Sequence, residues 1–357
     1  MYIIFEGIKY NIENFNHPGG NILLEYANTL DVTELVKSNH TKYSIELLKK
    51  LPIISNIKTK NTKKYFTFSD EYNNIKELVY NQNKIWESYK SCDKYDIIMW
   101  TSLFSYLILN HFSSDIFFST ILLIILGSYG HQYVHSSSDK ASMLTFSGFI
   151  SNHWRQEHLF SHHPYTNTVN DIDFTEFNKI NKNMKYIPSI LKFIIVSIII
   201  VIRPFIQTLT FSCIKNATFF DKIIILYNYY DIYMNTIKYC TKHFILAVWF
   251  LIIDYFNHYE HKVGQEVGKE VNPENLNWYE NQLNTTQNFV FNSYLYNNYP
   301  FIHSLLTFGL DRQVEHHLFP KIKMEHFSKI TLFLDSTKIK IHYFSFNSIK
   351  RIWNHFV

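Results

Sequence analysis

Three short segments of this 357-residue chain carry histidines at spacings that suit metal binding. They are HQYVH, with His131 and His135; HLFSHH, with His158, His162 and His163; and QVEHH, with Gln313, His316 and His317. Residues four apart share one face of a helix, so each segment presents neighbouring side chains. Neutral imidazole is the commonest protein ligand for transition metals. If the three segments converge, their nitrogens would suffice for two metal ions.

A single HxxxH or His-His pair is more often an ordinary structural feature than a metal site. Three such segments in one chain, each next to an apolar run, are much harder to explain in that way. Their conjunction therefore predicts a metal centre. We interpret the histidines outside these motifs as structural or surface residues; they include His111, His153, His243, His303, His326, His342 and His355.

Apolar runs lie beside these motifs and must position them. Two runs, near 97–112 and 116–130, are consecutive and almost free of charge, and two more lie near 190–212 and 240–256. The first two are a little shorter than the roughly 20 residues of a full membrane span. Buried helices of a soluble protein are the alternative, but consecutive charge-poor runs favour membrane hairpins. Arg203 interrupts the third run and would have to reach a polar boundary.

The number of crossings provides an independent test of a shared site. If residues 1–54 are cytosolic, the first two crossings return the chain to the cytosol just before His131. No apolar run separates His131 from His163, and two further crossings deliver Asn257 and His258 to the same face. The QVEHH segment follows without another apolar run. An even number of crossings thus gathers every motif on one side, whereas three would not.

Composition excludes several classes of protein. The cysteines, Cys92, Cys213 and Cys240, form no CxxC pair, which argues against a disulfide framework and covalent c-type haem and fits a reducing compartment. Glu6 and Lys9 interrupt the apolar N-terminus, so it does not resemble a signal peptide. The formal net charge is only +4 and the lysines are scattered, so no nucleic-acid partner is expected.

The segments HQYVH, HLFSHH and QVEHHLFP resemble the three histidine boxes of membrane fatty-acid desaturases. Glutamine in place of the first histidine of the third box resembles front-end desaturases, which insert a double bond between the carboxyl end and an existing one. HLFSHHPYTN resembles the second box of fungal and protist Δ5 acyl desaturases. The sequence departs from the family at Phe308–Arg312, FGLDR, where Gly-Gly-Leu-Asn-Tyr is usual.

This resemblance implies a desaturase domain over residues 96–357, an all-α polytopic membrane domain with about four transmembrane helices and a cytosolic histidine-rich cap. It also implies a di-iron centre with histidine ligands. Asn257-His258 resembles the family's Asn-His pair, and His261 is a competing candidate. Gln313 is a weak ligand and is expected to orient a ligand or a metal-bound water. The implied ligands are His131, His135, His158, His162, His163, His258, His316 and His317.

Residues 1–54 are expected to form a compact unit of their own. His17 lies in an HPGG turn and His40 in a later polar segment, and an apolar pocket is predicted from Leu23, Leu24, Leu35, Leu47 and Leu48. Two imidazoles facing across such a pocket would fill both axial positions of a haem, which suits electron transfer. The alternative is that HPGG is only a turn.

The segments YNIENFNHPGG and DVTELVKSNH resemble cytochrome b5. The resemblance implies a small α+β domain that binds haem b through His17 and His40, and a fused domain of this kind is typical of front-end desaturases. The unit is N-terminally short, because the family usually has another helix and strand ahead of it. Residues 55–95 are expected to be a linker or surface helix. Glu13, Asp31 and Glu34 form either an acidic face for a reductase or ordinary solvated charge.

Together these resemblances imply a front-end desaturase, with Δ5 as the preferred position, that acts on acyl-lipid or acyl-CoA using O2. Electrons from NADH or NADPH would pass through a cytochrome b5 reductase-type donor and the haem. Acid–base chemistry of side chains cannot break an unactivated C–H bond, so a redox metal is needed. The expected location is the endoplasmic reticulum membrane, with haem domain and histidine boxes cytosolic. Alternatives are a Δ6, Δ8 or sphingolipid-base desaturase and a non-catalytic haem-binding membrane relative.

Overall fold

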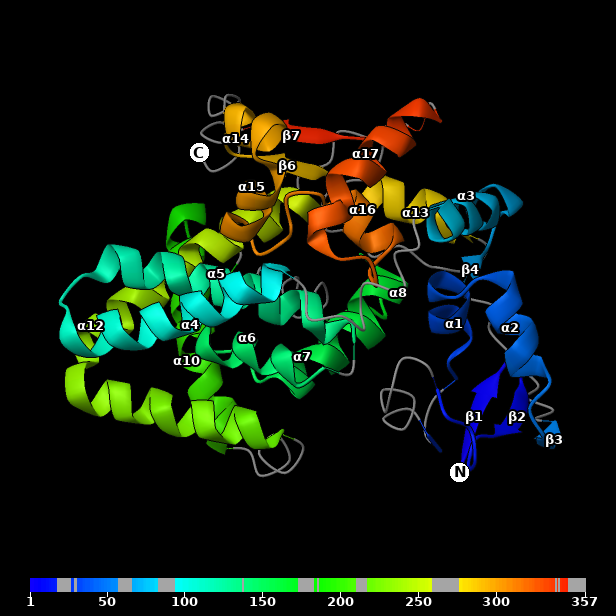
Figure 1. Ribbon diagram of the computed structural model, residues 1–357, viewed down its shortest axis with the longest axis horizontal. Helices are drawn as coiled ribbons and strands as arrows, with labels where there is room; N and C mark the ends of the chain where they lie inside the picture. Colours follow the sequence, from blue (N-terminus) through cyan, green and yellow to red (C-terminus); the bar gives the residue numbers. More distant parts are fainter. Residues whose placement is uncertain are drawn as a thin grey trace.

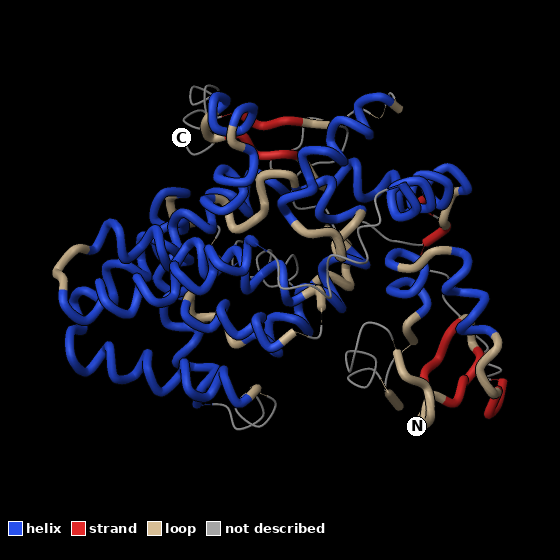
Figure 2. Tube along the Cα trace, in the orientation of Figure 1, coloured by secondary structure: helices blue, strands red, loops and turns tan. Residues whose placement is uncertain are grey.

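The structure is a computed structural model in which the described residues form a small α+β unit, a group of long helices and a cap of short elements (Figure 1). Helices dominate, and the strands lie in the N-terminal unit and the cap (Figure 2). The described residues are 1–17, 27–28, 31–56, 66–82, 94–136, 138–172, 183–184, 186–209, 217–258, 276–337, 339 and 341–345.

The N-terminal unit is an antiparallel sheet, in the order β1-β2-β3, packed against two short helices. Glu6 and Gly7 both have positive φ, the conformation of a tight two-residue hairpin between β1 and β2. Ile3, Phe5 and Val36 share its buried core. The strand content is too small to establish a cytochrome b5 fold. The elements are β1 (Tyr2–Phe5), β2 (Ile8–Asn11), α1 (Thr33–Asn39), α2 (Lys42–Lys49) and β3 (Ile53–Asn56).

The first two predicted spans fall in α4 (Lys94–Phe112) and α5 (Ile116–Val134). Asp115 turns the chain between them, because its carboxylate accepts a hydrogen bond from the Phe118 amide at 2.8 Å and caps α5. The long helix α5 is largely buried. In contrast, α4 exposes large apolar side chains at intervals of three and four residues, which makes one apolar stripe: Ile97, Trp100, Phe104, Ile108 and Phe112.

Helix α12 (Phe219–His258) reverses direction at Asn235, whose φ of −155° and ψ of 77° are not helical. Eleven residues of a straight helix rise roughly 16 Å, yet Lys242 Nζ lies 2.5 Å from Asp231 Oδ2. The two halves must therefore fold back on one another, as Figure 1 shows at its left edge. Asn235 begins the second half by accepting a hydrogen bond from the Lys238 amide at 3.1 Å.

This reversal revises the expected second hairpin, which was placed at 190–212 and 240–256. Helix α10 (Ser189–Leu209) packs against α12, and the chain reverses within α12 at Asn235 rather than between α10 and α12. Asp221, near the start of α12, accepts a hydrogen bond from Ser151 at 2.8 Å, just ahead of the second histidine motif. Both ends of α12 thus lie on the histidine side. Among the described residues, α5 and α12 are long and apolar enough to cross a membrane.

The remaining elements surround the histidine motifs. One face of α3 (Asp70–Gln82), in the segment expected to be a linker or surface helix, is buried, with Tyr72 and Lys76 fully covered. Strand β4 (Phe66–Thr67) pairs in parallel with β5 (Leu276–Asn277). The other elements are η3 (Asp139–Ser142), α6 (Met143–Phe146), α7 (Ser151–Glu157), η4 (His158–His162), α8 (His163–Tyr165), α13 (Trp278–Thr285), β6 (Asn288–Val290), α14 (Ser293–Asn298), α15 (Pro300–Leu306), α16 (Gln313–Leu318), η5 (Met324–His326), α17 (Phe327–Ser336) and β7 (Tyr343–Ser345).

Candidate metal centre

The histidine motifs converge from α5, the η4–α8 segment, the end of α12 and α16. All the predicted ligands are buried, with exposed fractions between 1% and 6%. The competing candidate His261 lies outside the described residues. The converging side chains are His131, His135, His158, His162, His163, His258, His316 and His317.

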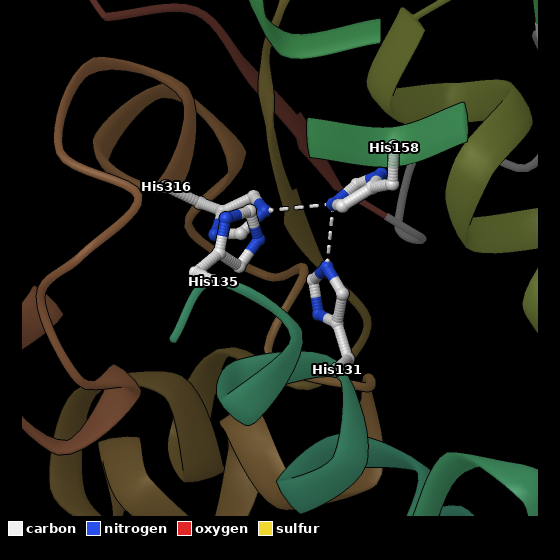
Figure 3. Close-up of side chains that lie close together, drawn as sticks. All are labelled: His131, His135, His158 and His316. Atoms are coloured by element: carbon white, nitrogen blue, oxygen red, sulfur yellow. Dashed lines mark hydrogen bonds between the residues drawn. The ribbon is translucent and has the colours of Figure 1, made fainter. Parts of the chain in front are cut away.

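A first group contains His131, His135, His158 and His316, whose ring nitrogens lie within 4.8 Å of one another (Figure 3). The Nε2 atom of His158 is 2.8 Å from Nε2 of His131 and 3.4 Å from Nε2 of His316. A metal–imidazole bond of roughly 2 Å places the nitrogens of adjacent ligands about 3 to 3.5 Å apart. The spacing of this group is therefore that of ligands around one ion.

A second group contains His162, His258 and His317. Their ring centroids form a nearly regular triangle, with separations of 4.7, 4.9 and 4.9 Å. His163 lies between the two groups, because its Nε2 is 3.0 Å from His158 Nε2 while its ring stacks on His317 at 4.3 Å. The structure thus divides seven of the eight rings into two candidate ion sites.

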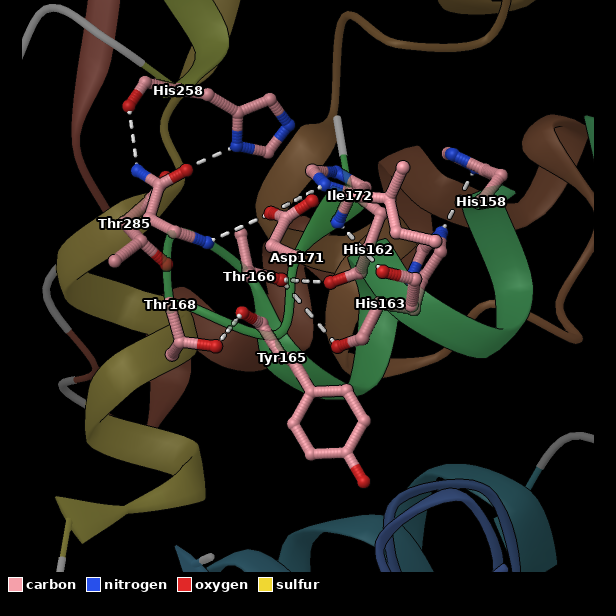
Figure 4. Close-up of polar contacts among 12 residues, drawn as sticks. His158, His162, His163, Tyr165, Thr166, Thr168, Asp171, Ile172, His258 and Thr285 are labelled. Carbon is pink, nitrogen blue, oxygen red and sulfur yellow. Dashed lines mark hydrogen bonds and ion pairs between the residues drawn. The ribbon is translucent and has the colours of Figure 1, made fainter. Parts of the chain in front are cut away.

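Each ring of the second group is fixed through the nitrogen that faces away from the centre. His162 Nδ1 is 3.0 Å from Asp171 Oδ2 and His258 Nδ1 is 3.1 Å from the Thr285 carbonyl, as Figure 4 shows. Such rear contacts select the tautomer and orient the ring in metal sites. No sequence motif marks these partners, although Asp171 follows the second motif by only eight residues.

His317 is anchored by side chains from other elements. Its Nδ1 is 2.9 Å from Gln282 Oε1 on α13 and 3.2 Å from Thr166 Oγ1. The amide of Gln313 lies on the opposite, central side, with Nε2 2.8 Å from His258 Nε2 and 3.1 Å from His317 Nε2. Gln313 therefore adjoins the second group at the position where a fourth imidazole is absent.

Local backbone geometry separates ligands that are close in sequence. The segment η4 is a single π-helical turn, which is wider than an α-helical turn and is often found at functional sites. His158 at its start belongs to the first group and His162 at its end to the second. The adjacent His316 and His317 also divide between the groups, with their rings inclined by 82°.

The turn before α16 supports the first group. Phe308 and Gly309 both have positive φ, of 58° and 72°, in the segment that departs from the family pattern. This conformation brings the Phe308 carbonyl to 2.9 Å from His131 Nδ1. Gly130, next to His131, permits close packing of α6 because glycine has no Cβ atom. A Cβ atom at this position would lie only 2.2 Å from the Leu144 amide nitrogen and would clash with it.

The centre favours uncharged rings. Burial, followed by the positive charge that neighbouring rings would carry, holds the pKa of each affected histidine well below its usual range. Metals bind the neutral ring, so burial prepares these side chains as ligands. The residues with this shift are His135, His158, His163, His316 and His317.

In the N-terminal unit, the rings of His17 and His40 face one another with centroids 6.0 Å apart. His40 Nδ1 lies 3.2 Å from the Val36 carbonyl, which leaves Nε2 directed away from α1. Pro18, Gly19 and Gly20 of the HPGG segment lie outside the described residues, as do Leu23 and Leu24 of the predicted pocket. Leu35 and Leu48 pack on the core.

Two side chains of the N-terminal unit differ from their expected positions. Leu47, assigned to the apolar pocket, is 41% exposed. Glu34, assigned to an acidic face or to ordinary solvated charge, is 6% exposed and therefore does not contribute to a solvated surface. Glu34 lies in the first turn of α1 and is buried there, which a charge count along the sequence does not reveal.

The long helices with buried histidines at one end define a helical protein with a candidate metal centre, and comparison with known proteins identifies its family. The profile of the family described as "Fatty acid desaturase" matches residues 107–347, so the chain belongs to that family. The "Probable Delta(5) fatty acid desaturase C" of Dictyostelium discoideum is 24% identical over 399 aligned residues, which cover 92% of this chain and 84% of that protein. No solved structure matches the chain.

Proposed function

We propose that the chain is a front-end fatty-acid desaturase with a di-iron centre held by the two histidine groups. The main support is the convergence of eight buried imidazoles, seven of them in two groups and His163 between, inside a desaturase-family domain. Both ring nitrogens of His135 are buried without a hydrogen-bond partner among the described residues, as suits a side chain reserved for a metal. When bound, two iron ions would supply the O2-dependent redox chemistry that removal of two acyl hydrogens requires.

The protein's own residues have separable roles in this proposal. His131, His135, His158 and His316 hold one ion, while His162, His258 and His317 hold the other, with His163 between them. Asp171, Gln282 and the Thr285 carbonyl orient the rings of the second group. Gln313 faces the position without an imidazole and holds a water or a small ligand there.

We also propose that residues 1–54 bind haem b and that residues 96–357 form the desaturase domain. Residues 55–95 connect these two parts of the chain. The facing rings of His17 and His40 fit a haem with both axial positions filled. The Val36 carbonyl fixes the ring of His40 from behind, as expected of an axial ligand. A cytochrome b5 reductase-type partner would supply electrons from NADH or NADPH.

The preferred position of the new double bond is Δ5, in acyl-lipid or acyl-CoA. The name of the Dictyostelium relative supports this position, as do Gln313 and the HLFSHHPYTN segment. A bound acyl chain must have one carbon held beside the metal, because reaction depends on near-contact geometry. The protein then selects the carbon by how deeply it holds the chain.

For the membrane arrangement we propose four crossings: α4, α5 and the two halves of α12. The apolar stripe of α4 faces lipid in this arrangement. The number of membrane crossings remains even in this proposal, so the histidine groups and the N-terminal unit lie on the same side of the membrane. We assign that face to the cytosol and the membrane to the endoplasmic reticulum.

The direct test is expression in a yeast strain that lacks polyunsaturated fatty acids. Defined dienes and trienes are fed, and new double bonds are located by mass spectrometry. A bond at carbon five that disappears in His316→Ala supports both the position and the centre. A bond at Δ6 or Δ8, or in a sphingolipid base, would replace the Δ5 assignment. No new bond in any lipid class, with haem bound and normal expression, would indicate a non-catalytic relative.

A further inference from the structure

Tyr72 joins the N-terminal unit to the third histidine motif. Its side chain is fully buried, and its hydroxyl lies 2.8 Å from the Ser38 carbonyl and 3.0 Å from the Leu318 carbonyl. A phenol carries one proton, so the hydroxyl donates to both carbonyls in a shared hydrogen bond. Ser38 precedes His40 by two residues and Leu318 directly follows His317. One hydroxyl thus connects the two sites by a short covalent and hydrogen-bonded route.

Several other contacts hold the edge of the N-terminal unit that contains Ser38 and His40, called the His40 edge below. Lys76 Nζ, on the next turn of α3, donates to the Lys37 carbonyl at 2.6 Å. Lys321, three residues beyond Leu318, places Nζ 3.3 Å from His40 Nε2, and haem bound to that nitrogen would replace this contact. Phe160 of the second motif packs against the core of the N-terminal unit. The His40 edge therefore rests on two histidine motifs and on α3.

The aromatic ring of Tyr72 and its hydroxyl have separable functions. Trp278 and Tyr279 contact the ring, with centroids 4.9 and 5.5 Å away, and a phenylalanine ring would keep these contacts. The hydroxyl is not needed to fill space. It satisfies one carbonyl on each side of the boundary, and buried carbonyls require such partners.

We propose that Tyr72 is a positioning residue that fixes the His40 edge against the third histidine motif, so that electron delivery depends on its hydroxyl. This inference rests on the proposed haem and iron sites. His17 and His40 would hold the haem that gives up one electron in each transfer, becoming ferric, and the histidine groups would hold the ferric ion that this electron reduces to ferrous. No bond is broken and Tyr72 keeps its proton. The reductant is NADH or NADPH, acting through a flavin reductase.

The test compares full-length Tyr72→Phe with Tyr80→Phe, a matched control on the same helix. Tyr80 approaches Phe319 through its ring, which the substitution retains. Reduced haem is mixed with the oxidised metal centre, and haem reoxidation is followed by absorbance. Tyr72→Phe should slow reoxidation about fivefold, equivalent to the roughly 1 kcal/mol of one neutral hydrogen bond. The haem spectrum, midpoint potential and iron content should not change, and Tyr80→Phe should match the parent.

A second measurement bypasses the N-terminal unit by supplying electrons to the metal centre from a small chemical reductant. Tyr72→Phe should then form product as the parent does, whereas a defect in the centre itself would persist. Equal haem reoxidation in Tyr72→Phe and the parent would overturn the inference, as would a defect that the reductant does not relieve. If the parent binds no haem or no iron, the proposed function itself fails, and the absorbance spectrum and metal analysis reveal that separately.

Discussion

The two histidine groups hold their rings in different ways. In the first group four nitrogens surround one point, yet His135 has no hydrogen-bond partner among the described residues at either nitrogen. In the second group there are three rings, and His162, His258 and His317 each have a contact behind the ring. The group with fewer imidazoles therefore has more external control of ring orientation.

The two groups therefore orient their imidazole rings by different kinds of contact. The first depends on helix packing, because Gly130 lets α6 approach the turn that carries His131. The second depends on hydrogen bonds from Asp171, Gln282 and Thr285, and it keeps a position beside Gln313 free of imidazole. An ion with fewer imidazole ligands has more positions for water or another small ligand.

The largest expected effects come from removing one ligand from each group. His316→Ala should release the ion of the first group and His317→Ala that of the second, so iron content should fall from about two per chain toward one. Desaturation should fall at least about a hundredfold in both variants. Metal analysis of the purified proteins tests the division between groups. Loss of both ions in both variants would show that the groups form one interdependent site.

Asp171→Asn should affect the second group alone. The amide keeps the shape of the carboxylate but removes the charge that favours a proton on His162 Nδ1 and directs Nε2 to the metal. Metal affinity should fall about 10- to 100-fold. Titration with a chelator measures this, and Asp139→Asn, at an exposed position on η3, is the control. Equal loss from both groups would contradict an anchoring role limited to His162.

Gln313→His should sharpen the contrast by giving the second group a fourth imidazole. The iron of the second group should become harder to remove. Product formation should fall about tenfold, because the added imidazole would take the position on that ion which a small ligand otherwise uses. Gln313→Ala should weaken retention by only a few fold, since an amide is a poor ligand. Chelator release rates and product yields are compared for both variants. Higher activity in Gln313→His would show that the amide does not guard an open position.

Gly130→Ala tests the dependence of the first group on packing. The added methyl would meet the Leu144 backbone at 2.2 Å, so α6 must move, at a cost of about 1 to 3 kcal/mol in stability. Gly127→Ala is the comparison, because its nearest contacts are the side-chain atoms of Ser147 and Phe308, which can shift more easily. Thermal unfolding in detergent should show the larger decrease for Gly130→Ala. If the unfolding temperature falls less in Gly130→Ala than in Gly127→Ala, packing of α6 against Gly130 does not support the position of His131.

The sequence by itself determined which side chains meet and where the first hairpin lies. HQYVH, HLFSHH and QVEHH, with His258, contain every imidazole of the centre, because residue type and helical spacing are local properties. The charge-poor runs around 97–130 determined α4 and α5 for the same reason. The prediction of an even number of crossings also came from counting apolar runs, and it stays a prediction.

Only the tertiary structure decided how those side chains are divided and oriented. A spacing of four predicted one shared face for His158 and His162, but the π-helical turn places them in different groups. Gln282 and Tyr72 gain their roles from contacts with distant segments, and no local pattern encodes such contacts. Asp171 gains its role from the turn that brings it back to His162. The reversal of α12 at Asn235 likewise brings Lys242 to Asp231 across the turn, a contact that no local pattern predicts. Residue type and local spacing predicted the candidate ligands, whereas tertiary contacts determined how their rings are grouped and oriented.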